Sequence, residues 1–84
     1  MPTISSFYGI LIIMHLRGKE HEPPHIHARY SGVEATFSID TGEILLGIFP
    51  QSGAKLVKQF ILLHKEELLE MWNTQIFKKL PPLE

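Results

Sequence analysis

The chain has 84 residues, no cysteine and a formal net charge of −1. This length fits one domain, and the lack of cysteine excludes disulfides, thiolate metal sites and a cysteine nucleophile. The near-zero charge argues against a protein held to nucleic acid by bulk electrostatics. The longest apolar run, Ile10–Met14, is far shorter than the roughly 20 residues that span a bilayer, and no signal-peptide pattern accompanies it. We therefore expect a cytoplasmic protein.

Before Pro50 the sequence favours strands, in chain order over about residues 8–16, 25–30, 33–40 and 43–49. The second and third of these alternate apolar and polar residues, as half-buried strands do. A two-residue turn at Ser31-Gly32 would pair apolar with apolar and polar with polar residues throughout. The expected pairs are Tyr30–Val33, Arg29–Glu34, Ala28–Ala35, His27–Thr36, Ile26–Phe37 and His25–Ser38. This agreement predicts a hairpin with one buried face.

After Gly53 apolar residues recur at three- and four-residue steps as far as Trp72, which is typical of an amphipathic helix. Continued to about Ile76, the helix would be roughly 36 Å long, whereas an eight-residue strand spans about 26 Å. It must overhang the sheet, bend near His64 or pack on a partner. We expect an α+β fold, a four-stranded antiparallel sheet followed by one long, at most bent, C-terminal helix on one face. One domain spans residues 1–77, with a tail over 78–84.

Three polar residues of the second strand, His25, His27 and Arg29, occupy alternate positions and therefore share one face. We expect the two imidazoles to project together into solvent. Flanking a phosphodiester, one would take the 2′-hydroxyl proton of RNA and the other would protonate the leaving 5′-oxygen. Arg29 would stabilise the phosphorane, and Thr36 and Ser38 would orient the rings. This hypothesis describes a metal-independent, ribonuclease-like enzyme without a cofactor.

A metal site is a second interpretation of the same segment. His-x-His on a strand is a two-point chelate, and His21 in the preceding loop would add a third nitrogen to His25 and His27. Glu20 or Glu22 would supply a carboxylate.

A third interpretation is that these are solvated or hydrogen-bonded surface histidines, with a structural role or a contact with a partner protein, and that Pro23-Pro24 only shapes the entry to the strand. Arg29 opposite Glu34 is also explained as a cross-strand ion pair. Of the other histidines, His64 lies on the apolar stripe of the helix and is expected in the core, and His15 is assigned to no site.

Three stretches of the chain together resemble a known family. They are Met1–Ser5, Pro23-Pro24-His25-Ile26-His27-Ala28 and Leu63-His64-Lys65-Glu66-Glu67-Leu68-Leu69 with Trp72. Over about residues 1–75 the chain resembles the bacterial and archaeal domain-of-unknown-function family 4160. The double proline followed by His-x-His-Ala is the most specific of the three motifs.

The resemblance implies a compact cytoplasmic protein of prokaryotes, often encoded beside a second small protein. Such pairs are similar to type II toxin–antitoxin modules, with this family as the toxin and its neighbour as the cognate antitoxin. The family supplies no established catalytic residue. Its members often carry a basic pair soon after the proline equivalent to Pro50, where this chain has only Lys55 and Lys58 to contact phosphate. The alternative is a non-catalytic binding module, or the antitoxin itself.

One helix covers only one face of a sheet. Apolar residues such as Leu11, Ile13, Leu45 and Phe49 are therefore expected on the other face, beside the histidines. Exposed apolar patches of this kind mark interfaces. We expect either a homodimer or a complex with the cognate partner.

Overall fold

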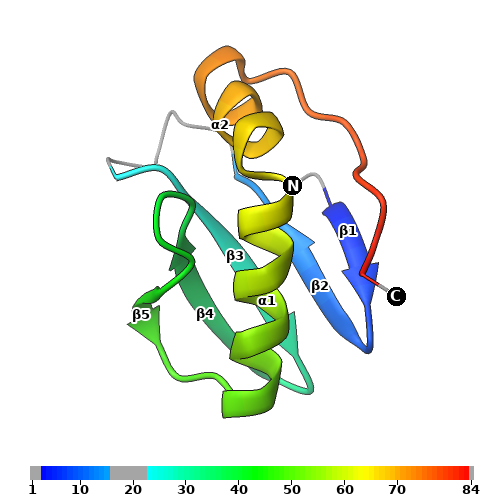
Figure 1. Cartoon of the computed structure of the whole chain (residues 1–84). Coiled ribbons are helices and arrows are strands. Elements are labelled where there is room, and N and C mark those ends of the chain that lie inside the picture. The colour runs from blue at the N-terminus through cyan, green and yellow to red at the C-terminus, as the bar shows by residue number, and fades with distance from the viewer. Residues whose placement is uncertain (1–2, 16–22, 84) are drawn as a thin grey trace.

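The computed structural model describes residues 3–15 and 23–83. Five strands form one antiparallel sheet in chain order, and two helices follow. The strands are β1 (Thr3–Phe7), β2 (Ile10–Ile13), β3 (His25–Tyr30), β4 (Val33–Ser38) and β5 (Ile44–Gly47). The helices are α1 (Gln51–Leu63) and α2 (Lys65–Thr74). Helix α1 crosses one face of the sheet (Figure 1). The predicted α+β class is confirmed, with one strand more than expected.

The additional strand is at the start of the chain. A single strand was expected over residues 8–16, but β1 and β2 form a hairpin that turns at Tyr8 and Gly9. These two residues have φ angles of 51° and 78°, and positive φ at both central positions is what a type I′ turn requires. Tyr–Gly is not a usual pair for such a turn, so the sequence gives little sign of it.

The central hairpin has the predicted register. All pairs expected between β3 and β4 are present, from Tyr30 with Val33 at the turn to His25 with Ser38 at the far end. Ser31 and Gly32 form the two-residue turn with φ angles of 47° and 85°. A one-residue slip would move every apolar side chain of this hairpin to the opposite face, which is why the pattern determines the register.

The expected long helix bends at His64, which separates α1 from α2. His64 has φ −113° and ψ 24°, outside the helical range, yet its amide donates to Phe60 O and its carbonyl accepts from Leu68 N. The bend brings α2 across the end of the sheet (Figure 1) and buries Trp72 and Met71. A straight helix would have left these side chains beyond the sheet.

His64 is a core histidine, as its position on the apolar stripe predicts. It is 8% exposed, and its Nδ1 lies 2.8 Å from Glu67 Oε1. Its buried Nε2 has no hydrogen-bond partner among the described residues.

The core lies between the sheet and the helices. Its largest fully buried side chains include Trp72, Phe37, Phe60, Ile12 and Ile26. Phe49, expected on the uncovered face, is 7% exposed and packs in this core, with its ring 5.5 Å from that of Phe37. That expectation was wrong.

No helix of the described residues is long and apolar enough to cross a bilayer.

The segment after α2 runs back beside β1 (Figure 1). The amide of Leu80 donates to Ile4 O at 2.9 Å, and the Leu80 side chain is 5% exposed within the core. Part of the segment expected as a tail therefore packs on the domain. Its hydrogen bond to Ile4 O satisfies one backbone carbonyl of the edge strand β1.

Candidate functional site on the histidine face

The alternation of β3 places its polar side chains on the face of the sheet opposite α1. Ile26 and Ala28 are fully buried in the core that the sheet shares with α1, so His27 and Arg29 point the other way. We call the surface around them the histidine face. It comprises His15, His25, His27, Arg29, Glu34 and Thr36.

Three imidazole rings lie in contact on this face, with His27 in the middle. The ring centroids of His15 and His27 are 4.2 Å apart with an interplanar angle of 85°, and those of His25 and His27 are 5.4 Å apart at 79°. His15 was assigned to no site from the sequence. Its placement follows from the pairing of Ile13 with His27, because a residue two positions beyond Ile13 points to the same face.

His25 does not project into solvent as expected. It is 9% exposed, its ring lies 4.8 Å from that of Trp72, and its Nδ1 lies 2.8 Å from Pro23 O. Because a carbonyl oxygen accepts but does not donate, Nδ1 carries the proton in this contact. His27 is also less open than expected, with 15% of its side chain exposed.

A carboxylate joins His27 to Arg29. Glu34 Oε2 lies 3.4 Å from His27 Nδ1, while Glu34 Oε1 accepts from Nε and Nη2 of Arg29 at 3.2 and 3.1 Å. Thr36 Oγ1 lies 3.5 Å from the same nitrogen of His27. The predicted Arg29–Glu34 pair is present and solvent-exposed, so it stabilises the fold by less than about 1 kcal/mol. Its larger effect is to fix the carboxylate beside His27.

Other predicted site residues lie away from this cluster. Ser38 pairs with His25, but its Oγ accepts from the amides of Asp40 and Thr41 and so belongs to the following turn. Lys58 Nζ lies 2.6 Å from Glu43 Oε2.

Lys55 is exposed on α1. Since α1 covers the opposite face of the sheet (Figure 1), neither Lys55 nor Lys58 meets the histidines. His21 lies outside the described residues, as do Glu20 and Glu22.

The metal-donor set also differs from the one expected. His15, His27 and Glu34 each offer one ligand atom, and these atoms lie within 4.8 Å of one another. His25, a member of the predicted set, is not part of this group. Glu34 was considered from the sequence only as the partner of Arg29.

The comparison with known proteins identifies the family. A family model described as a domain of unknown function, DUF4160, matches residues 9–73. The chain belongs to the DUF4160 family. No curated protein and no solved structure matches it. The matched range contains every residue of the histidine face, and it omits β1.

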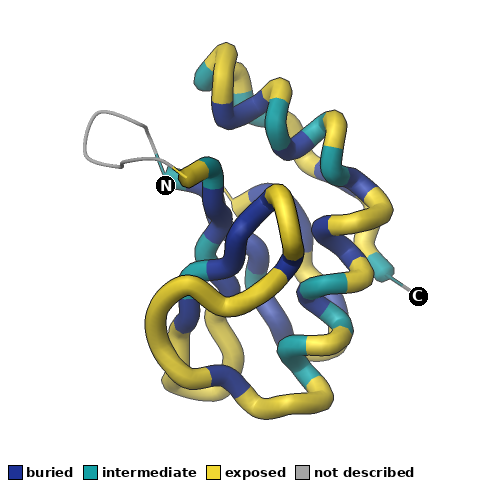
Figure 2. The backbone as a smooth tube through the Cα atoms, turned by 60° about the vertical axis from the view of Figure 1, so that its left-hand side comes forward, coloured by how far each residue is buried: buried dark blue, intermediate teal, exposed yellow. Residues whose placement is uncertain are grey.

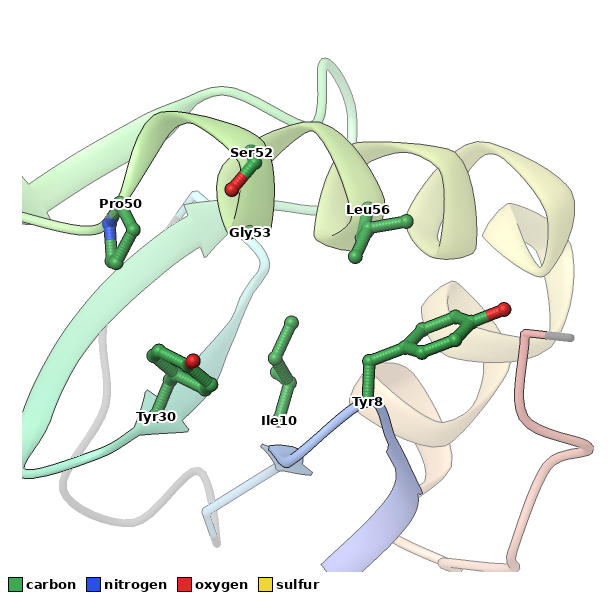
Figure 3. Close-up of a pocket in the computed structure, with 7 residues that line it drawn as sticks. All are labelled: Tyr8, Ile10, Tyr30, Pro50, Ser52, Gly53 and Leu56. Carbon is green, nitrogen blue, oxygen red and sulfur yellow. The ribbon is translucent and has the colours of Figure 1, made fainter.

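A pocket in this DUF4160 chain lies away from the histidines. Side chains of Tyr8, Ile10 and Tyr30 face the first turns of α1 at Ser52, Gly53 and Leu56, as Figure 3 shows. Its volume of about 130 Å³ corresponds to roughly four water molecules. It is too small for a nucleotide, and it lies on the α1 side of the sheet. None of the residues of the histidine face lines this pocket.

Proposed function

We propose that this DUF4160 chain is the toxin component of a two-protein toxin–antitoxin module and that it acts on RNA at the histidine face. The contact between the His15 and His27 imidazoles, beside a carboxylate and a guanidinium, is the observation that carries this proposal. Imidazole is the side chain whose ordinary protonation equilibrium suits both halves of a proton-transfer reaction at neutral pH.

The position of the Glu34 carboxylate indicates which histidine acts as the base and which as the acid. Glu34 beside Nδ1 of His27 favours a proton on that nitrogen, which leaves Nε2 to act as the base. A base oriented by a carboxylate is the arrangement found in many nucleophilic sites. His15 takes the role that the sequence suggested for His25. The buried His25, which contacts both His27 and Trp72, positions the His27 ring.

The proposed reaction is transesterification of the RNA chain. His27 takes the proton of a 2′-hydroxyl, whose oxygen attacks the adjacent phosphorus. The bond from phosphorus to the 5′-oxygen breaks, and the imidazolium of His15 protonates that oxygen, leaving a 2′,3′-cyclic phosphate. Arg29 contacts the phosphoryl oxygens, since a guanidinium has five N–H groups and two of them bind Glu34.

Expression and cleavage assays test the proposal together. We expect the chain to arrest growth when expressed alone and to cleave RNA in the presence of a chelator, with a 2′,3′-cyclic phosphate end. His15→Ala and His27→Ala should each reduce cleavage about 100-fold or more and relieve the arrest. Lys79→Ala, which alters an exposed residue outside the histidine face, is the control. If both histidine variants still arrest growth, His15 and His27 do not take part in the toxic activity.

A non-catalytic binding role is the second candidate, and the edge of the sheet supports it. Residues 43–48 are all exposed (Figure 2), and among the strands of the described residues β5 has a neighbour on one side only. We use the name β5 edge for the exposed apolar side chains of this strand and the residue after it, which are Ile44, Leu45, Leu46 and Ile48. An unpaired strand edge is a template for a strand of another chain. In the proposed module this edge binds the cognate partner. A chain that rescues growth without arresting it would instead be the antitoxin.

A further inference from the structure

We propose that His15, His27 and Glu34 form a binding site for one divalent transition-metal ion of the Zn²⁺ type. The three residues come from three successive parts of the sheet. His15 follows β2, His27 lies in β3 and Glu34 lies in β4. Two imidazoles and one carboxylate are a common protein donor set for Zn²⁺ when a fourth position is left to water or substrate. The proposal concerns metal binding by the chain alone and does not require an RNA substrate.

The distances are close to those that an ion demands. Bonds of about 2.1 Å arranged tetrahedrally place neighbouring donors about 3.4 Å apart. His27 Nδ1 and Glu34 Oε2 are already 3.4 Å apart, and the ligand atoms of all three residues lie within 4.8 Å of one another. A rotation of the His15 ring that shortens its distances to the other two donors by at most about 1.4 Å completes the triangle.

The surroundings of two of the three donors, Glu34 and His27, restrain them. Arg29 donates twice to the second oxygen of Glu34, and Thr36 Oγ1 lies 3.5 Å from His27 Nδ1. Partners of this kind outside the ligand set hold metal-binding side chains in position. The central strands β3 and β4 are paired along their whole length, so the backbone that carries two of the donors is rigid.

Exposure of the donors indicates the type of site. His15 and His27 are half-buried, and 39% of the Glu34 side chain is exposed. Three protein ligands on a partly open surface leave room for a water molecule or a substrate oxygen as fourth ligand. Structural zinc sites instead have four protein ligands and are closed.

A bound ion should inhibit the proposed RNA cleavage. Only this expectation rests on the proposed function. An imidazole that holds an ion on one nitrogen cannot also be an imidazolium, which carries a proton on each nitrogen. The ion would therefore remove the imidazolium of His15 that protonates the leaving 5′-oxygen, and the metal-loaded chain would be the inhibited form. Adding Zn²⁺ should then suppress the cleavage that proceeds in a chelator.

The first test is metal binding by the untagged chain without RNA. Calorimetric titration with Zn²⁺ should give one ion per chain, and Co²⁺ should give the intense visible absorption of a tetrahedral site. His15→Gln, His27→Gln and Glu34→Gln should each weaken binding at least about tenfold. Glu43→Gln removes an exposed carboxylate from outside the site and should leave binding unchanged. Circular dichroism verifies that every variant is folded.

His25→Gln distinguishes this site from the set expected from sequence. We expect this variant still to bind one ion per chain and to lose less affinity than any of the three ligand variants, because His25 contacts the His27 ring and donates to Pro23 O but is not a ligand. Nitrogen-15 shifts of the imidazoles should change on titration for His15 and His27. A stoichiometry well below one, or binding that depends on His25 but not on His15 and Glu34, overturns the proposal. Since RNA is absent from these measurements, a failed cleavage assay leaves their outcome intact.

Discussion

The imidazole of His15 lies edge-on to that of His27, with ring centroids 4.2 Å apart. These rings come from positions 12 residues apart in the chain, and the pairing of Ile13 with His27 brings them together. Glu34 then approaches His27 from the next strand, at 3.4 Å from Nδ1. The sheet thus assembles a cluster that can transfer protons or bind an ion, and both proposals depend on the same contact.

His25 and His27 should contribute differently to stability. His25 is buried against Trp72 and its Nδ1 donates to Pro23 O, so His25→Ala leaves a cavity and an unpaired carbonyl. We expect it to lower the free energy of unfolding by about 2 kcal/mol, and His27→Ala by less than about 1 kcal/mol. Urea denaturation of both variants measures the difference. Equal losses would mean that His25 has no special structural role.

Gly47 should tolerate no side chain. Its φ is +96°, and an added Cβ would lie 2.8 Å from Glu34 O and 3.1 Å from Ala35 Cα. Gly32 also has a positive φ, +85°, but a Cβ there would meet nothing within 4 Å. Gly32→Ala therefore reports the backbone strain alone, about 1–2 kcal/mol. Gly47→Ala should cost at least about 1 kcal/mol more, measured by urea denaturation. A similar loss in both variants would contradict the steric argument.

Leu80 should anchor the segment beside β1. Leu80→Ala removes a side chain that is 5% exposed in the core, and we expect the free energy of unfolding to fall by about 2–3 kcal/mol. The amide of residue 80, which donates to Ile4 O, should exchange with solvent faster in the variant. Lys79→Ala, at the exposed neighbouring position, should change stability by less than about 0.5 kcal/mol. Unaltered amide exchange would show that this anchor is not needed.

The sequence predicts the β3–β4 hairpin residue by residue because two independent signals agree there. Strict alternation determines which side chains are buried, and Ser31-Gly32 supplies a two-residue turn that fits the same register. Strand β1 lacks both signals. Its residues include Ser5 and Ser6, and its turn requires positive φ at Tyr8, a residue type that rarely adopts it.

The candidate site was predicted only where local pattern was sufficient. Alternation places His27 and Arg29 on one face and Glu34 opposite Arg29, as found. His15 could not be placed, since its face depends on the register between β2 and β3. Phe49 was misplaced for a similar reason. A register shift between Thr36 and Phe37 and the positive φ of Gly47 interrupt the alternation that leads to it.

If the chain acts in the proposed two-protein module, the β5 edge should be the surface that binds its partner. Leu46 and Ile48 are 74% and 86% exposed, so Leu46→Lys and Ile48→Lys should leave stability nearly unchanged. A lysine on an edge strand opposes pairing with another chain, and we expect either substitution to weaken the complex at least about tenfold. Co-purification and light scattering measure complex formation, and light scattering also detects a homodimer through the same edge.

Leu63→Lys provides the matched control for these substitutions, because Leu63 is a similarly exposed leucine, 67%, on α1. It should leave the complex intact if the partner pairs with β5. Loss of the complex in Leu63→Lys, with Leu46→Lys unaffected, would transfer the interface to the outer side of α1. In that case the β5 edge would remain exposed in the complex, and strand pairing would no longer account for the association.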